Sequence, residues 1–397
     1  MKVLFLLSSL EPAGSETYCV SLAKAWQGQH EIFWISDRLH FGQSYLSLPI
    51  SGKAFPAGVS NTFKVSRFIR ENRIQIVHSH SRRSHWVAVQ AAALTHIPHV
   101  TTIHQPPPVH LFSRLFPCLG DIAIAIDEVV SDHLQAHFGR KPESIRLIRN
   151  GIEIPAAHPK LPPQGGKGMK RIAILGRLSG GRWQAVQFFF DVLKRIAKSL
   201  PAAQYLVAGR VPEERASDLA EQLRIVNSAI APSTIELTGW TDHLADFISS
   251  CDGIVAAGRS GLESLALGRP VLMMGEGGVI GLAGPETWEQ ALRTNLGDHI
   301  TPKEFYPAKL EVALRELLGD SNSSGEKARW ARSQVEKYYD IRTVARDIEN
   351  VYKDLCSAVT PAKAGVYRNQ RPMDSGSPND RRPGPPDVWR AGLRPPE

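Results

Sequence analysis

The chain has 397 residues, of which 42% are apolar and 22% charged, and it carries a net charge of +8 with a pI near 9.3. The length predicts two domains of about 150–200 residues. The composition is that of a globular protein, and no run of about 18 apolar residues occurs that could span a membrane. The positive charge favours an anionic partner, which leaves nucleotide phosphates, nucleic acid and an anionic membrane surface as candidates.

The amino terminus and the cysteines bear on the cellular compartment. The opening MKVLFLLSSL is apolar, but the polar segment after it lacks a small-residue cleavage pattern, so we expect a buried first strand rather than a signal peptide. The four cysteines stand singly, without CxxC pairs or metal-ligand spacing. We expect reduced thiols in a cytoplasmic protein.

Short apolar runs alternate with helical patterns over residues 1–155. Continuous Val, Ile and Leu runs separated by helices predict a parallel sheet covered on both faces and wound by right-handed crossovers into a Rossmann-like domain. Strands are predicted at Val3–Leu7, Glu31–Ile35, Ile74–His78, His99–Ile103, Asp121–Ile126 and Ile145–Ile148. Helices are predicted at Glu16–Trp26, Ser84–Leu94 and Val129–Phe138.

A segment rich in Pro, Gly and Lys, residues 156–170, is predicted to be an interdomain linker. The alternation then restarts and predicts a second Rossmann-like domain over residues 171–340. Its strands are predicted at Arg171–Leu175, Gln204–Ala208, Ile235–Gly239, Gly253–Ala257 and Val271–Met274. Its helices are predicted at Trp183–Ser199, Glu213–Ile225 and Asp242–Ile248.

After Asp340, which is suited to cap a helix, apolar residues recur at steps of three and four. This pattern predicts a terminal helix over residues 341–357 that packs back across the cleft between the domains. Residues 358–397 are dominated by Pro, Arg and Gly, so we expect a disordered tail. The predicted fold class is therefore α/β, with two doubly wound Rossmann-like domains facing one cleft.

Ligands of open α/β sheets bind beyond the carboxyl ends of the strands, so the loops there should carry the chemistry. The first such loop has Gly14 at a helix start, where backbone N–H groups can approach an anion, although a plain strand-to-helix turn explains the glycine equally well. No GxGxxG motif occurs, so a nicotinamide-dependent enzyme has no support.

The loop GRLSGGRWQ, residues 176–184, places Arg177 and Arg182 on either side of a glycine-rich helix start. Two guanidinium groups in this position are suited to bind the oxygens of a diphosphate. A solvated turn with two surface arginines is the alternative.

The stretch GRSGLESLALGRPVLMMGEGG, residues 258–278, contains one carboxylate near a helix start and a glycine-rich turn with Gly277. Ser260 and Glu263 match the S-x-x-E capping box, in which the glutamate would only cap the helix. A carboxylate at the mouth of the cleft could instead accept two hydrogen bonds from a ribose diol. On the residues alone both interpretations stay open.

Three histidines, His78, His80 and His104, follow predicted strands of the first domain. Structural histidines that form hydrogen bonds are the more common case. A zinc site built from the three would lack a carboxylate or thiol partner, and no Asp-x-Asp motif occurs that could hold a metal-bound diphosphate. We therefore expect no metal ion and no cofactor.

These motifs resemble those of the family 4 retaining glycosyltransferases of GT-B fold, over residues 1–357. AGSE at residues 13–16 is similar to the family's Gly-Gly-Ala-Glu loop, and IRLIRNGIEI at residues 145–154 is similar to its Ile-x-x-Ile-Pro-Asn-Gly-Ile-Asp segment. GRLSGGRW resembles Gly-Arg-Leu-x-x-x-Lys-Gly, and LESLALGRPV resembles Leu-Glu-Ala-Met-Ala-x-Gly-x-Pro-Val.

The resemblance implies a role for each matched residue. Arg177 and Arg182, the latter in place of a lysine, would hold the donor diphosphate and act in catalysis. Glu263 would bind the donor ribose, and His104 would lie beside the reacting sugar. The predicted catalytic residues are His104, Arg177 and Arg182, and the predicted donor-binding residues are Gly14, Arg177, Arg182, Arg259, Glu263 and Gly277.

The chain departs from the family at one position. Family members carry a second glutamate eight residues before the ribose-binding one, in contact with the transferred sugar. Val255 stands at that position here, and Arg259 is predicted to take some of the space. The sequence therefore leaves open the identity of the donor sugar and the choice between retention and inversion.

We expect a metal-independent glycosyltransferase that moves a sugar from a nucleotide-diphosphate sugar to an acceptor hydroxyl, in the synthesis of a cell-surface polysaccharide, lipopolysaccharide or glycolipid. The apolar and basic residues 104–117 and the basic residues 64–73 predict peripheral contact with an anionic membrane, at the inner face of the cytoplasmic membrane, and a lipid-linked or glycan acceptor. Ordinary amphipathic helices with one solvated face are the alternative.

Two other functions stay open at this point. A nucleotide-sugar epimerase of the same fold would turn over the donor without an acceptor, and a non-catalytic sugar-nucleotide-binding protein would bind the donor without turnover. Nucleic-acid binding has no stacking-aromatic motif to support it, so we expect no nucleic-acid partner.

Overall fold

The computed structural model describes residues 1–7, 14–37, 46–50, 54–156 and 169–358, with the backbone alone for residues 54–58. The predictions for Ala13 and the residues just before it, for most of the linker and for the tail beyond Ala358 lie outside the described residues. Residues Met1–Cys356 form one compact unit.

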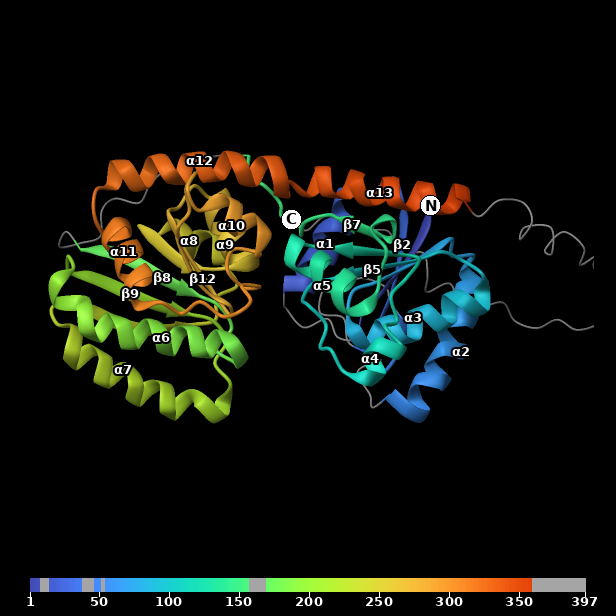
Figure 1. The fold of residues 1–397 in the computed structure, drawn as a ribbon, viewed down its shortest axis with the longest axis horizontal. Helices are drawn as coiled ribbons and strands as arrows, with labels where there is room; N and C mark the ends of the chain where they lie inside the picture. Colours follow the sequence, from blue (N-terminus) through green and yellow to red (C-terminus); the bar gives the residue numbers. More distant parts are fainter. Residues whose placement is uncertain (8–13, 38–45, 51–53, 157–168, 359–397) are drawn as a thin grey trace, which may run out of the picture. The chain divides into compact units, whose positions relative to one another are not determined.

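The N-terminal half contains a seven-stranded parallel sheet in the order β3-β2-β1-β4-β5-β6-β7 (Figure 1). Strand order reverses between β1 and β4, which is the doubly wound arrangement that the sequence predicts. The strands are β1 (Lys2–Leu6), β2 (Glu31–Ser36), β3 (Leu46–Ser47), β4 (Ile76–Ser79), β5 (His99–Ile103), β6 (Ile122–Ala125) and β7 (Ile145–Leu147). The helices are α1 (Gly14–Ala25), α2 (Ala54–Asn72), α3 (Arg82–Thr95), α4 (Leu111–Leu115) and α5 (Glu128–Phe138).

Alternate residues of the central strand β1 fill two separate cores, one on each face of the first sheet. Leu4 and Leu6 pack with Ile69 of α2 and with other apolar residues of α2 and α3. Val3 and Phe5 pack on the opposite face, with residues of α1 and of the last helix of the chain. Burial of both faces explains why the strands are continuous apolar runs.

The C-terminal half contains a six-stranded sheet in the order β10-β9-β8-β11-β12-β13, parallel except for β13 at its edge. Figure 1 shows α6 and α7 on one face of this sheet and α8, α9 and α10 on the other. The strands are β8 (Lys170–Leu175), β9 (Ala203–Ala208), β10 (Thr234–Gly239), β11 (Gly253–Ala256), β12 (Val271–Gly275) and β13 (Gly278–Leu282). The helices are α6 (Gly180–Ile196), α7 (Ala216–Ile230), α8 (Leu244–Ser249), α9 (Gly258–Ala266), α10 (Trp288–Arg293) and α11 (Pro307–Leu318).

The glycine-rich segment after β12 is more regular than the predicted turn. β13 begins at Gly278 and pairs antiparallel with β12, with Gly275 opposite Gly278. The connection is therefore a tight hairpin with Glu276 and Gly277 at its tip. A further strand, not an irregular turn, accounts for most of these glycines.

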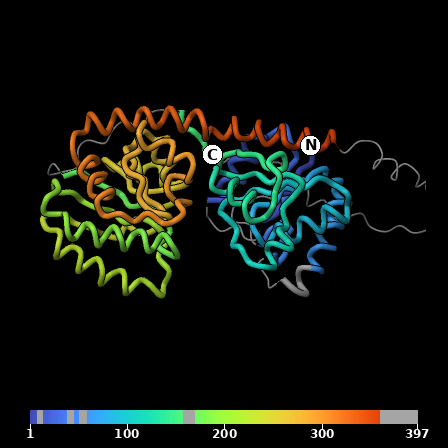
Figure 2. Tube along the Cα trace, viewed as in Figure 1, coloured from blue at the N-terminus to red at the C-terminus, as the bar shows by residue number. Residues whose placement is uncertain are grey.

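The last two helices pack on different sheets. Apolar residues of α12 (Ser321–Tyr339) join the core of the second sheet, and those of α13 (Ile341–Ala358) join the core of the first (Figure 2). Asp340 caps α13, because its carboxylate accepts a hydrogen bond from the Arg342 N–H at 2.9 Å. The indole of Trp26 donates to the Ala345 carbonyl at 3.1 Å, so α13 is bound to α1 by polar as well as apolar contacts.

Two observations concern the cysteines and the helices of the described chain. Each of the four cysteines is a free thiol. Within the described ranges, no helix has the length and apolar character needed to cross a membrane.

Candidate active site

Residues beyond the carboxyl ends of the first sheet contact residues beyond the carboxyl ends of the second. Asp127, two residues past β6, pairs with His299, with 2.5 Å between Oδ2 and Nδ1. Arg259, at the start of α9, donates to the Gly151 carbonyl past β7 at 3.3 Å. The two edges where α/β sheets bind ligands therefore face each other, and the predicted site residues can be located on both.

Arg177 and Arg182 flank the start of α6, directly after β8. The connection needs its glycines, because Gly180 adopts φ 59°, a left-handed conformation that side chains disfavour. Arg177 is exposed and makes no hydrogen bond or ion pair with any described residue. Arg182 lies in the first helical turn and is mostly buried.

Two carboxylates surround the guanidinium of Arg182. Its Nη2 lies 2.5 Å from Oδ2 of Asp298, and its Nε lies 3.7 Å from Oε1 of Glu276 at the hairpin tip. The start of α9 is also close, since a Cβ on Gly258 would lie 3.3 Å from Arg182 Nη2. The two predicted arginines therefore differ: Arg177 is unpaired among the described residues, whereas Arg182 is held by a short ion pair and a looser one.

The predicted capping box at Ser260 is wrong. α9 begins at Gly258, with Ala257 as its N-cap residue and no capping side chain, because β11 leads into the helix with no intervening loop. Glu263 therefore lies inside the helix, and its Oε1 is 2.8 Å from Nε of Arg259, one turn earlier. Burial raises the pKa of Glu263, and the charge of Arg259 partly opposes this effect. Helix capping no longer explains this carboxylate.

Arg259 connects Glu263 to the N-terminal half. Besides Gly151, its guanidinium lies within hydrogen-bond distance of Ser21 Oγ in α1, at 3.5 Å. A Cβ on Gly14 would lie 3.9 Å from the Arg259 Cβ, so the start of α1 packs directly on this arginine. The structure thus brings Gly14, Arg259 and Glu263 together.

Val255 cannot replace the missing family glutamate. It lies within β11, is 1% exposed and belongs to the apolar core between the second sheet and α6. The residue eight positions before Glu263 therefore lies within a buried strand rather than in a loop. Whether Arg259 takes over the space of that glutamate stays a prediction.

His104 follows β5 on the facing edge of the first sheet. Its ring lies 5.7 Å from that of Tyr18 and 5.8 Å from that of His80, measured between centroids. Both ring nitrogens are covered from solvent and lack a hydrogen bond of good geometry, and the side chain of Asn150 lies beside the ring. Burial lowers the pKa of His104 to about 4, with Asn150 opposing and His299 adding to the shift, so the imidazole is neutral at neutral pH.

The other two histidines differ from each other. His78 uses both ring nitrogens, with Nδ1 2.5 Å from the Tyr352 hydroxyl and Nε2 2.7 Å from Thr102 Oγ1. This is the structural role that the sequence favours. His80 has no hydrogen-bond partner among the described residues and stacks between His78 and His104. In the parts of the chain that the structure describes, no group of three or more His, Cys, Asp or Glu side chains is arranged to hold a metal ion.

Gly277 is accounted for by packing. Its N–H donates to the Gly297 carbonyl at 3.1 Å, and its carbonyl accepts from the Glu304 N–H at 2.7 Å. A Cβ at this position would lie 2.5 Å from the Ile300 nitrogen. The N–H and the carbonyl of Gly277 are therefore both hydrogen-bonded within the protein and are not free to bind a donor. A donor-binding role for Gly277 stays a prediction.

Sequence reasoning did not find Asp127, Asp298, His299 or Tyr18. Asp127 carried a usable signal, because it is a polar residue placed just after a buried strand, where ligand-binding loops begin. Asp298 and His299 lie in a segment without helical or strand periodicity, far along the chain from the residues they contact. Tyr18 has a buried hydroxyl without a partner among the described residues, on the same side of the first sheet as His104.

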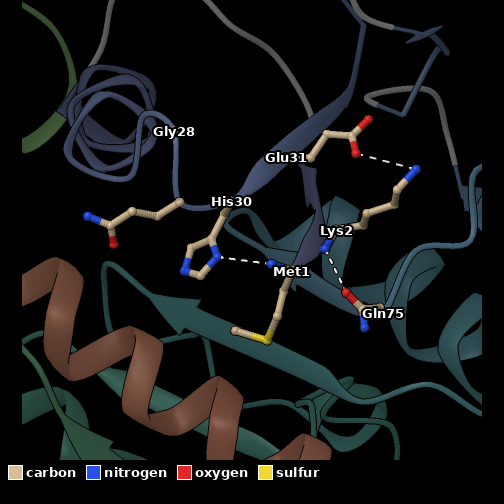
Figure 3. Close-up of a pocket in the computed structure, with 7 residues that line it drawn as sticks. Met1, Lys2, Gly28, His30, Glu31 and Gln75 are labelled. Atoms are coloured by element: carbon tan, nitrogen blue, oxygen red, sulfur yellow. Dashed lines mark hydrogen bonds and ion pairs between the residues drawn. The ribbon is translucent and has the colours of Figure 1, made fainter.

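A surface hollow of about 480 Å³ lies at the opposite end of the first sheet from the candidate site, beside the amino ends of β1 and β2 (Figure 3). Its polar groups pair with each other: the Met1 amine lies 3.2 Å from His30 Nδ1, and Lys2 lies 3.3 Å from Glu31. None of the predicted site residues lines it. The carboxyl-end edges remain the candidate active site.

Two doubly wound α/β domains whose carboxyl-end residues meet define the GT-B fold, and comparison with solved structures agrees. A glycosyltransferase from Rickettsia africae ESF-5 aligns with a TM-score of 0.72 and 16% identity, over 90% of this chain and 99% of that chain. Anabaena HepE, solved with UDP and glucose, aligns at 0.68 and 17% identity, over 89% and 100%. The lipopolysaccharide outer core galactosyltransferase WaaB aligns at 0.60 and 16% identity, over 89% and 100%.

Family models identify both halves of the chain. The model of glycosyltransferase family 4 matches residues 12–154, and that of the glycosyl transferases group 1 matches residues 169–305. No curated protein sequence matches the chain significantly. The chain therefore belongs to the glycosyltransferases of GT-B fold, with a family 4 domain followed by a group 1 domain.

Proposed function

We propose that the protein transfers a glycosyl unit from a nucleotide-diphosphate sugar to an acceptor hydroxyl. The observation that carries this proposal is the arrangement of Arg177, Arg182 and Glu263 at the carboxyl ends of β8 and β11, within the half matched by the group 1 model. A diphosphate needs positive charge, and a ribose diol needs an acceptor carboxylate; these side chains provide both. HepE, a structural neighbour, binds UDP and glucose.

The two arginines would act on the diphosphate in different ways. Arg177, unpaired among the described residues, is placed to contact the phosphate oxygens directly. Arg182 adds charge from a position fixed by Asp298, and the phosphate would compete only with the more distant Glu276 for its Nε. Negative charge develops on the diphosphate as it leaves, so these contacts, with the N-terminus of α6, would stabilise the transition state more than the ground state.

The remaining predicted residues would bind the ribose, the sugar and the acceptor. Glu263 would accept hydrogen bonds from the ribose hydroxyls, with Arg259 and Gly14 packed beside it. His104 has a neutral ring whose buried nitrogens lack a well-formed hydrogen bond, with Asn150 beside it, so it would position a sugar or acceptor hydroxyl by hydrogen bonding. With guanidinium groups supplying the positive charge, the proposal requires no metal ion.

A panel of nucleotide-diphosphate sugars, assayed for binding and for turnover with and without acceptor extract, tests this proposal. A transferase binds one donor and releases the nucleotide faster when acceptor is present. Turnover to an epimeric nucleotide sugar without acceptor would instead indicate an epimerase, and binding without any turnover would indicate a silent binder. NMR of the product anomer would establish whether the reaction retains configuration, as the family resemblance implies.

For the acceptor, we propose a lipid-linked or surface glycan used in cell-envelope synthesis. The support is the apolar, cationic surface that directly follows the His104 loop, together with the acceptor-side position of the family 4 domain. WaaB, which shares this fold, is a lipopolysaccharide galactosyltransferase by its name. Bacterial membrane vesicles or lipid extracts should therefore act as acceptors and raise donor turnover, whereas soluble monosaccharides should not.

A further inference from the structure

The short helix α4 exposes large apolar side chains. Leu111, Phe112, Leu115 and Phe116 are each between 53% and 76% exposed, and no residue of the helix is buried. The rings of Phe112 and Phe116 lie 5.2 Å apart, and both contact the ring of Trp86 in α3, at 5.9 and 6.3 Å. We call these five residues the α4 patch.

Local hydrogen bonds hold this helix in place although none of its residues is buried. Its cap is reciprocal: the Ser113 N–H donates to His110 Nδ1, and the His110 N–H donates to Ser113 Oγ, both at 3.0 Å. The preceding proline segment is fixed as well, because His133 of α5 lies 2.7 Å from the Pro107 carbonyl. The exposure of the patch is therefore built into the fold.

The surroundings of the patch are cationic. Arg114 of α4 is exposed, and so is Arg82, one helical turn before Trp86 on α3. From Asn72 to Gly120 the sequence contains four arginines and no Asp or Glu. An apolar face with aromatic rings and arginines at its border is the composition that binds the interface of an anionic bilayer.

The second basic segment predicted from the sequence, residues 64–73, behaves differently. Val65 and Ile69 are buried in the core of the first sheet. Arg67 pairs with Glu71 at 2.6 Å, and Arg70 donates to the Leu94 carbonyl at 3.0 Å. This part of α2 is the ordinary amphipathic helix that the sequence left open as an alternative, so among the two predicted segments α4 is the one that presents an apolar surface with a cationic border.

We propose that the α4 patch docks the protein on an anionic lipid surface. The inference deepens the proposed function, since α4 follows the His104 loop in sequence and docking there would deliver a lipid-linked acceptor to the acceptor edge. An anionic bilayer satisfies both the apolar and the cationic side chains. A second copy of this chain would instead bring two cationic patches together, which is unfavourable.

Sedimentation with sucrose-loaded vesicles tests the proposal on the full chain. We expect binding to vesicles of phosphatidylglycerol and phosphatidylcholine at low salt, loss of binding at high salt, and little binding to pure phosphatidylcholine. The triple variant Leu111→Ser, Phe112→Ser, Leu115→Ser should lower the partition coefficient at least about tenfold, and Arg114→Glu severalfold. A matched control, Ile225→Ser with Val312→Ser, removes apolar residues that are 45% and 65% exposed in the other half and should change nothing.

A second measurement guards against misfolded variants. Bromine-labelled lipids should quench part of the tryptophan fluorescence of the wild type, and Trp86→Phe should abolish that part. Circular dichroism melts of the triple variant should match those of the wild type, because α4 contributes no buried residue.

Three results would overturn the proposal: no vesicle binding at low salt, equal binding by the folded triple variant, or a dimer of the wild type that the triple variant abolishes. Calorimetric titration with UDP separates it from the proposed function. UDP binding without vesicle binding would end the docking proposal alone, and vesicle binding without binding or turnover of any nucleotide sugar would end the transferase proposal alone.

Discussion

The carboxyl-end edges of the two sheets share one winding pattern but differ in the side chains that they carry. The N-terminal edge has His78, His80 and His104, whose pKa values are lowered by burial, so these rings are neutral. The C-terminal edge is built from ion pairs, Arg182 with Asp298 and Glu276, and Arg259 with Glu263. The fold determines where ligands approach, whereas the local residues determine which part of a donor–acceptor pair each edge can bind.

This difference follows from the charge of the two reactants. A diphosphate must be matched by fixed positive charge, and the carboxylates that hold those arginines when no donor is bound keep them in position. A sugar or acceptor hydroxyl needs a hydrogen-bonding partner without net charge, which a neutral imidazole provides. We therefore propose donor binding at the C-terminal edge and acceptor binding at the N-terminal edge.

The largest effect is expected from Arg177→Ala. Loss of a guanidinium that binds the leaving diphosphate should lower kcat/KM by about 100- to 1000-fold. Steady-state kinetics with the preferred nucleotide sugar measures this, and Arg177→Lys should recover part of the activity. Arg224→Ala, which removes a surface arginine paired with Glu221, is the matched control. Near-normal activity of Arg177→Ala would contradict the proposal that the C-terminal edge neutralises the charge of the diphosphate.

A smaller effect is expected from Glu263→Gln, which removes a charged acceptor from the ribose. We expect the Kd of the donor to rise about tenfold to a hundredfold, the range for a hydrogen bond to a charged group. Ser260→Ala is the control in the same helix, since Ser260 caps nothing and should leave donor affinity unchanged. If Ser260→Ala weakened donor binding and Glu263→Gln did not, the role of Glu263 would be purely structural.

The neutral histidines predict that acid destabilises the N-terminal half. A histidine whose pKa is lowered in the folded state binds fewer protons than in the unfolded chain, so stability is lost as the pH falls below the unfolded pKa near 6.5. Each such group adds a slope of about 1.4 kcal/mol per pH unit, down to a pH of about 4 for His104 and about 3 for His99. Urea unfolding between pH 7 and 4 measures this slope.

The variant His99→Gln should show a smaller slope of the unfolding free energy against pH, reduced by the contribution of one bound proton. Only His299 is expected to act in the opposite sense among the histidines discussed, because Asp127 raises its pKa despite the opposing effect of burial. Its contribution is present below pH 6.5 and is lost as the pH rises through the raised pKa. A stability profile that is flat between pH 7 and 4 would contradict the account of the buried histidines in the N-terminal half.

The strands and most flanking helices could be predicted because buried parallel strands are continuous apolar runs. β13 could not, since its glycines resemble a turn, and α12 could not, because its sequence SNSSGEKARW is polar with small buried residues. The positions of Arg182 and Glu263, near the starts of the helices that follow β8 and β11, were predictable from the ends of those strands. The ion pair of Arg182 with Asp298 was not, because it joins residues far apart in sequence that only tertiary packing brings together.

Hydrogen exchange of the full chain with and without UDP tests most directly whether a nucleotide diphosphate binds at the C-terminal edge. We expect added protection over residues 176–184 and 257–264, at the starts of α6 and α9, and no comparable change at the carboxyl ends of β4 and β5. Protection confined to the N-terminal sheet, or no protection at saturating UDP, would contradict the account.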